Sequence, residues 1–94
     1  MSKSIISNEK VCLLCGYTQS IHKHHVFGGT ANRKLSEKYG CWVYLCARHH
    51  NMSKYGVHFD KHLDNQLKQL CQRRWDALYG DRDKFQQIFG KNYL

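Results

Sequence analysis

Hydrophobic residues in the C-terminal third of the chain recur at steps of three and four, the spacing of one face of an α-helix. The series is Phe59, Leu63, Leu67, Leu70, Cys71, Trp75, Leu78 and Tyr79. Asp60 can cap the start of this helix and Gly80 can end it, and Asp81 can cap a last short helix that ends before Gly90. We interpret residues 60–94 as a helical scaffold that buttresses the rest of the chain.

Two shorter segments upstream have the character of β-strands. Residues 21–27 are an extended stretch that a glycine pair interrupts, and residues 41–46 combine β-branched and aromatic side chains. Between them, residues 33–39 could form a short helical turn closed by Gly40. The two strands could pair across this loop.

Length and composition favour one small domain, residues 1–94. The chain has no proline, no internal repeat and no low-complexity tract that would mark a linker. So short a chain buries a modest core and often needs a metal or a disulfide for stability. We therefore expect a single α+β domain in which strands and a short helix, in about residues 11–62, pack against the C-terminal helices.

The chain carries 15 Lys and Arg against 7 Asp and Glu, a formal net charge of +8. An excess of this size favours a polyanionic partner such as nucleic acid, although it can also be an ordinary basic surface. No run of apolar residues has the length needed to cross a bilayer, so we expect no membrane partner.

The five cysteines are an odd number, and the first ten residues contain no apolar signal sequence, so a secreted disulfide scaffold is disfavoured. In a reducing compartment, paired cysteines mixed with histidines more often hold a metal than form a disulfide. Cys41 and Cys71 lack a partner at chelating spacing, and we interpret them as core residues. We expect a soluble, cytoplasmic protein.

Two chelating pairs, Cys12-x-x-Cys15 and Cys46-x-x-His49, supply the four ligands of a closed, tetrahedral, structural zinc site. A two-residue gap lets both side chains of a pair converge on one ion. The alternative is that these cysteines are small buried hydrophobic residues, as free cysteines often are. The 30 residues between the pairs, 16 to 45, exceed the spacing of a compact zinc ribbon, so an insertion separates them.

All seven histidines lie between positions 22 and 62, less than half of the chain. His24 and His25 are adjacent on an extended segment, so they project to opposite faces. One of the two can bind a metal while the other acts as a base toward water, a role that suits an imidazole with a pKa of about 6.5. A histidine base and one divalent cation can together supply what phosphodiester hydrolysis requires.

Two alternatives stay open for the histidines. His22 lies on the same face as His24, where it could bind metal or face solvent, and we leave it out of the site. The histidines as a set could instead be solvated or helix-capping residues on a surface that binds nucleic acid.

Taken together, these motifs resemble those of the HNH endonucleases, also called ββα-metal nucleases, and especially the small zinc-containing members from phages and prophages. The resemblance rests on Cys12-x-x-Cys15, on His24-His25-Val26 followed by Gly28-Gly29, and on Leu45-Cys46-Ala47-Arg48-His49-His50 with Gly56-Val57-His58 behind it. It covers about residues 11–62. It implies a zinc-stabilised ββα-metal fold and metal-dependent hydrolysis of DNA phosphodiester bonds.

The resemblance also implies roles for single residues. His24 and His50 are expected to bind the catalytic divalent cation, and His25 is expected to polarise the attacking water as general base. A further ligand usually follows about one helical turn after the position of His50, where this chain has no histidine. We expect His58 rather than His62 to supply it.

In the HNH family, a central asparagine holds the loop that orients the general base. Asn32 is the only asparagine between the two histidine motifs. We assign it this catalytic role, although Cys41 occupies the position just before the second strand. For the cation, an all-histidine ligand set suits Mn²⁺, Ni²⁺ or Zn²⁺ better than Mg²⁺, which prefers oxygen. The resemblance keeps Mg²⁺ among the candidates.

Basic residues crowd the same segments as the histidines: Lys23, Arg33, Lys34, Lys38 and Arg48. Such residues grip phosphates and make binding salt-dependent without reading sequence. We therefore expect low sequence specificity, or targeting by a phage or host protein. Lys68, Arg73 and Arg74 are expected to be solvated on the outer face of the long helix.

The rival class is a non-catalytic zinc-finger module that binds nucleic acid or a phage protein through its basic surface. A third possibility is a subunit of a larger phage machine that is active only with its partner. Metal-dependent plasmid cleavage that is lost in His25→Ala separates the enzyme from the binding module.

Overall fold

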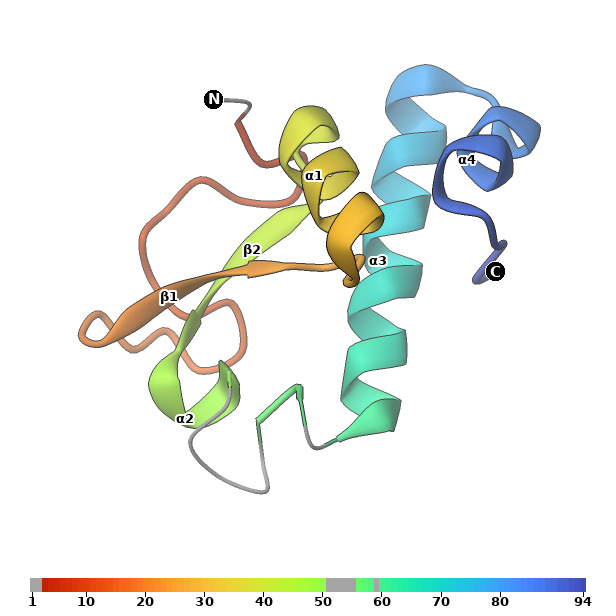
Figure 1. Ribbon diagram of the computed structural model, residues 1–94. Coiled ribbons are helices and arrows are strands. Elements are labelled where there is room, and N and C mark those ends of the chain that lie inside the picture. The colour runs from red at the N-terminus through yellow and green to blue at the C-terminus, as the bar shows by residue number, and fades with distance from the viewer. Residues whose placement is uncertain (1–2, 51–55, 59) are drawn as a thin grey trace.

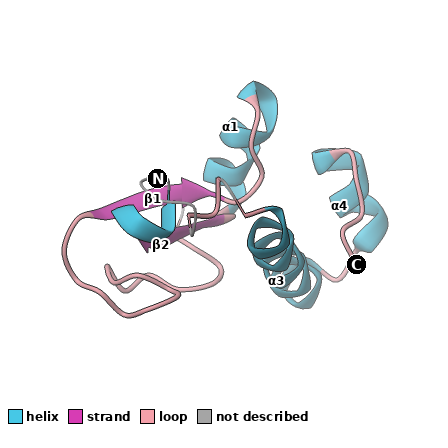
Figure 2. Ribbon diagram, turned by 90° about the horizontal axis from the view of Figure 1, so that it is seen from below, coloured by secondary structure: helices cyan, strands magenta, loops and turns pink. Residues whose placement is uncertain are grey.

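The computed structural model describes residues 3–50, 56–58 and 60–94. Its elements, in chain order, are β1 (Ile21–His25), α1 (Thr30–Tyr39), β2 (Trp42–Cys46), α2 (Ala47–His50), α3 (Lys61–Tyr79) and α4 (Arg82–Phe89). The described part is a small mixed α+β structure with one two-stranded sheet, which confirms the predicted class. The hairpin and α2 lie on one side of α3, and α4 lies on the other (Figures 1 and 2).

The two predicted strands pair, and they do so antiparallel. The register runs from Ile21 opposite Cys46 to His25 opposite Trp42. β1 ends two residues before the predicted end of the extended stretch at residue 27. Because paired residues across an antiparallel ladder point to the same face, this register decides which histidines face the core.

α1 has ten residues, where the sequence predicted a short turn over 33–39. It ends as predicted at Gly40, whose left-handed φ of 73° lets its N–H donate back to the Ser36 carbonyl. The Ser36 hydroxyl accepts from the Phe27 N–H at 3.1 Å and donates to the Phe27 carbonyl at 3.0 Å. This buried pair of hydrogen bonds fastens α1 to the segment that follows β1.

The two C-terminal helices begin and end at the predicted residues. The side chains of Asp60 and Asp81 each accept a hydrogen bond from the backbone N–H three residues later, at 3.1 Å and 3.0 Å. Gly80 and Gly90 end the helices in the left-handed conformation, with φ of 68° and 81°. No helix in the described part of the chain is long and apolar enough to cross a membrane.

The hydrophobic core joins the inner face of the hairpin to α3 and α4. Its largest fully buried side chains include Trp75 of α3, Phe85 of α4 and Phe27. Cys41 and Cys71 are both completely buried in this core, which confirms their interpretation as core residues. Val43 and Leu45 of β2 belong to the same buried cluster as Leu67, Cys71 and Trp75 of α3.

Candidate metal centres

The four predicted zinc ligands lie together at one end of the hairpin. They are Cys12, Cys15, Cys46 and His49, and one ligand atom of each lies within 4.8 Å of the others. The Sγ atoms of Cys15 and Cys46 are 3.8 Å apart, and His49 Nδ1 lies 3.7 Å from Cys12 Sγ. Zn–S bonds of about 2.3 Å at tetrahedral angles separate two sulfurs by about 3.8 Å. This Cys/His group can therefore hold a metal ion such as zinc.

A tight turn brings the first two cysteines of the group together. The Cys12 carbonyl accepts from the Gly16 N–H at 2.8 Å, and the Cys12 N–H donates to the Tyr17 carbonyl at 2.8 Å. Gly16 takes a left-handed φ of 75°, which glycine adopts without a steric penalty. The Leu13 N–H then donates to the Tyr44 carbonyl at 2.9 Å, which fixes the turn to β2.

Backbone donors favour the thiolate form of Cys12. Burial by itself raises the pKa of this thiol, but hydrogen bonds from the backbone N–H groups of Cys46, Cys15 and Leu14 outweigh burial and lower the pKa to about 6. The thiolate is the form that binds a metal. The local structure therefore prepares this sulfur for ligation near neutral pH.

A second group, of three histidines, lies against the core-facing side of the hairpin. It consists of His24, His50 and His58, and one ligand nitrogen of each lies within 4.8 Å of the others. The Nε2 atoms of His50 and His58 are 3.0 Å apart, and the three rings meet edge to face. The structure thus brings together the three histidines that the sequence suggested as cation ligands. We call them the three-histidine group.

Backbone hydrogen bonds return the chain to the end of α2 and so place His58. The N–H of Val57 donates to the His49 carbonyl at 2.7 Å, and the N–H of His58 contacts the His50 carbonyl at 3.3 Å. His58 therefore lies beside His50 in space, although it follows His50 by eight residues in the chain. His49 and His50 are neighbours on α2, so one residue of the Cys/His group is directly bonded to one residue of the three-histidine group.

The three-histidine group fits a divalent cation. His24 is only 6% exposed, and its Nε2 is buried without a hydrogen-bond partner among the described residues. Burial, together with the nearby His50 and His58, lowers the pKa of His24 to about 3, and burial lowers that of His50 to about 4. Both rings are neutral at pH 7, as metal ligation requires. A buried nitrogen left without a partner is costly, and a cation would satisfy it.

His22, which we left out of the site on sequence grounds, contacts the three-histidine group. Its Nδ1 lies 3.0 Å from Nδ1 of His50, and the two rings meet edge to face with their centroids 5.1 Å apart. The alternation along β1 already put His22 on the face of His24. The sequence could not show that His50 would arrive there.

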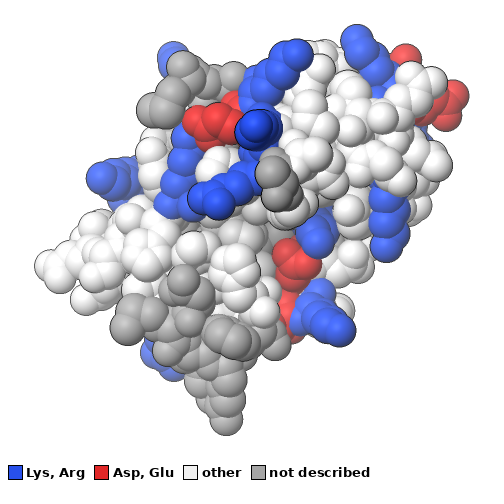
Figure 3. All heavy atoms as spheres, viewed as in Figure 1, with Lys and Arg blue, Asp and Glu red and all other residues white. Residues whose placement is uncertain are grey.

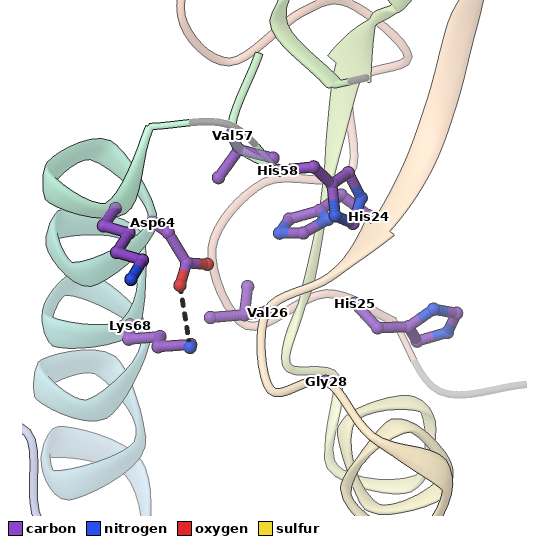
Figure 4. Close-up of a pocket in the computed structure, with 9 residues that line it drawn as sticks. His24, His25, Val26, Gly28, Val57, His58, Asp64 and Lys68 are labelled. Atoms are coloured by element: carbon purple, nitrogen blue, oxygen red, sulfur yellow. Dashed lines mark ion pairs between the residues drawn. The ribbon is translucent and has the colours of Figure 1, made fainter.

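His25 points away from His24 and His58, on the other face of β1 (Figure 4). Its Nε2 lies 3.0 Å from Glu37 Oε2, and the other oxygen of Glu37 accepts from Lys23 Nζ at 2.7 Å. Lys23 first, and then His25, lowers the pKa of Glu37. Nothing in the sequence marks Glu37, because it reaches His25 only when α1 packs beside β1.

His25 and the three-histidine group nevertheless line one pocket of about 280 Å³, together with Lys23, Gly28, Gly29 and Arg33. A second pocket, of about 310 Å³, shares His24 and His58 with the first and reaches α3 (Figure 4). Lys68 and Asp64 line it and form an ion pair of 2.8 Å. Lys68, which we expected on a solvated outer face, therefore borders the histidines.

The basic residues proposed for phosphate contact divide between two places. Lys23, Arg33 and Lys34 line a third pocket with His25 and Glu37, and Lys and Arg side chains gather over α1 on the face shown in Figure 3. Arg48 is exposed on α2 and lies at the Cys/His group instead.

Asn32 faces α4 and not the histidines. Its Nδ2 donates to the Phe89 carbonyl at 3.4 Å, which links α1 to α4. Its assignment as the family's central asparagine therefore has no support in these contacts. His62 is exposed on α3 and lies outside the three-histidine group.

Comparisons with protein-family models, with curated proteins and with solved structures found no match to this chain. The geometry and chemistry of the two groups and of the pockets beside them are therefore the observations that bear on function.

Proposed function

We propose that this protein is a metal-dependent endonuclease of the HNH type, in which β1, β2 and α2 form the ββα-metal unit, and that it hydrolyses phosphodiester bonds in DNA. One observation carries the proposal. Three histidines from separate segments meet, and a fourth, His25, lines the same pocket beside lysine and arginine. Ligand nitrogens, a separate imidazole and cations in one pocket are the components that phosphodiester hydrolysis needs.

In this proposal His24, His50 and His58 hold one divalent cation, and His25 takes a proton from the attacking water. When bound, the cation supplies an electrophile for the charge that develops on the phosphate and on the leaving oxygen. Glu37 accepts the hydrogen bond of the His25 Nε2–H, so the other ring nitrogen keeps the lone pair that receives the proton.

The Cys/His group holds a structural zinc that stabilises α2 and the turn beside it. All of its four ligands come from the protein, as in structural sites, whereas the three-histidine group leaves room for a water or substrate ligand. Mn²⁺, Ni²⁺ or Zn²⁺ suits an all-nitrogen site better than Mg²⁺ does. Manganese, nickel and zinc are therefore the first cations to test.

DNA binds across the pocket through its phosphates. Lys23, Arg33 and Lys34 supply positive charge at the edge of the pocket that holds His25. Contacts of this kind position the backbone and do not read bases, so we expect low sequence specificity.

Plasmid cleavage tests the proposal. Supercoiled DNA is incubated with the purified protein and added Mg²⁺, Mn²⁺, Ni²⁺ or Zn²⁺. We expect metal-dependent cleavage that falls by roughly 10²- to 10⁴-fold in His25→Ala and stays at the wild-type level in His62→Ala. DNA binding without cleavage under every metal would favour the non-catalytic zinc module instead. Full cleavage by His25→Ala would remove His25 from the mechanism.

A further inference from the structure

We propose that His22 is a positioning residue that fixes the tautomer and the ring orientation of His50 within the three-histidine group. The inference rests on the proposed function only in taking His24, His50 and His58 as ligands of a divalent cation. It goes further, because a site with three protein ligands does not by itself need another histidine.

His50 has a close partner at each of its two ring nitrogens. Its Nε2 lies 3.0 Å from Nε2 of His58, and its Nδ1 lies 3.0 Å from Nδ1 of His22. Between two imidazole nitrogens, a separation of 3.0 Å is a hydrogen bond when one nitrogen carries a proton and the other a lone pair. Two lone pairs or two N–H groups at that distance repel each other.

A cation shared by His50 and His58 decides where the protons lie. Each ring binds it through an unprotonated nitrogen, and their two Nε2 atoms already face each other. The neutral ring of His50 then carries its proton on Nδ1, and this N–H donates to Nδ1 of His22. His22 in turn carries its own proton on Nε2.

The acceptor is held in place by the hairpin. His22 pairs with Leu45 in the register of β1 and β2, on the same face as His24. Among the described residues, no Asp or Glu forms a hydrogen bond or an ion pair with His50. His22 therefore stands where many metal-binding histidines have a carboxylate or a carbonyl as the acceptor of their second N–H. Such an acceptor orients the ligand ring and raises its basicity.

Metal binding tests the inference without a cleavage assay. Tag-free protein that carries zinc in its Cys/His group is titrated with Ni²⁺ in a calorimeter. We expect the wild type to take up a second metal ion, and His22→Phe, which keeps a ring but no acceptor, to bind it roughly 10- to 100-fold more weakly. His22→Asn places an amide oxygen near the former Nδ1 and is expected to bind Ni²⁺ nearly as tightly as the wild type.

His62→Phe is the matched control, because His62 is exposed and outside the group, and its Ni²⁺ affinity should not change. Zinc content and thermal unfolding establish that each variant is folded, and His22→Val replaces His22→Phe if the latter does not fold. Unchanged affinity in the folded acceptor-free variant overturns the role of His22 and leaves the cation site intact. Equal loss in His22→Asn also overturns it. If the wild type binds no second ion, the cation site and the inference fail together.

Discussion

His49 and His50 are neighbours in sequence but belong to different groups. Successive side chains on an α-helix diverge by about 100°, so α2 directs the ring of His49 toward Cys46 and the ring of His50 toward His58. At the scale of single residues, the two groups are therefore coupled through one peptide bond. A metal held by the Cys/His group would restrain His50 through His49, and we expect its removal to displace His50.

Cys12→Ala tests the Cys/His group directly. It removes one of four ligands, so we expect the variant to lose its tightly bound zinc and to fall in unfolding free energy by more than about 2 kcal/mol. Cys71→Ala is the control, because Cys71 is equally buried but lies in the core. It should keep its zinc at a cost of about 1 kcal/mol. Elemental analysis and urea unfolding provide the two readouts, and zinc retained by Cys12→Ala would exclude this ligand set.

Glu37→Ala tests the contact that holds His25. The variant leaves the His25 ring without its acceptor, so we expect kcat for DNA cleavage to fall by about 10-fold or more. KM should not rise, because Lys23 loses its partner and remains free to bind phosphate. Ni²⁺ affinity should not change either. Exposed Glu9 provides the control variant, Glu9→Ala. A rise in KM at constant kcat would assign Glu37 to substrate binding and not to positioning.

At the scale of elements, α1 completes the pockets that His25 lines. It carries Glu37 to His25 and Arg33 to the pocket edge. Hydrogen bonds fasten it at both ends: Asn32 contacts α4, and the carbonyl of Gly40 accepts from the Ile5 N–H at 3.0 Å. The position of α1 therefore depends on the N-terminal segment and on the last helix as well as on the hairpin.

Gly40→Ala should loosen this attachment. A Cβ at Gly40 would clash with the carbonyl of Lys3, and the φ of 73° disfavours any L side chain. Gly80 has a similar φ of 68° but nothing near the added atom, so Gly80→Ala isolates the cost of the backbone conformation. We expect about 1 kcal/mol for Gly80→Ala and clearly more for Gly40→Ala in urea unfolding. Equal costs would show that the packing of residue 3 on Gly40 is unimportant.

At the scale of the whole molecule, the basic side chains behind the net charge of +8 are unevenly distributed over the surface. Basic side chains gather over α1, and the acidic residues that line the three pockets beside the histidines are, in the described part of the chain, Glu37 and Asp64. Because long-range attraction to a polyanion follows the summed field, this side of the protein is expected to meet DNA first.

Salt dependence distinguishes the pocket from the rest of the basic surface. Arg33 and Arg73 are both exposed, but only Arg33 lines the pockets with His25. In Arg33→Ala, the slope of log affinity for duplex DNA against log salt should fall by about 0.9, as expected for one lost phosphate contact. Arg73→Ala should leave the slope unchanged. A lower slope in Arg73→Ala with an unchanged slope in Arg33→Ala would instead show that DNA binds at Arg73 on α3.

Local features were predictable because they depend on neighbours in the chain. Asp60 begins α3 and Gly80 ends it, each through a hydrogen bond with a residue three or four positions away. The spacing of Cys12 and Cys15 likewise predicted a turn that brings two metal-binding side chains together. The contact between Glu37 and His25 was not predictable, because the two residues are twelve positions apart and lie on different elements. Asn32, chosen by elimination from the sequence, contacts α4 instead.

The kinds of metal ligand in this protein, the ends of its two C-terminal helices and the alternation of histidines along β1 could be predicted from the sequence. These follow from side-chain chemistry and from backbone periodicity, which act over a few residues. Which histidine rings meet depends on how distant segments pack. Three features set the distances between the rings: the hairpin register, the contact of Val57 and His58 with α2, and the packing of α1 beside β1. Each joins segments that are far apart in the chain, and no local sequence pattern shows that such segments will meet.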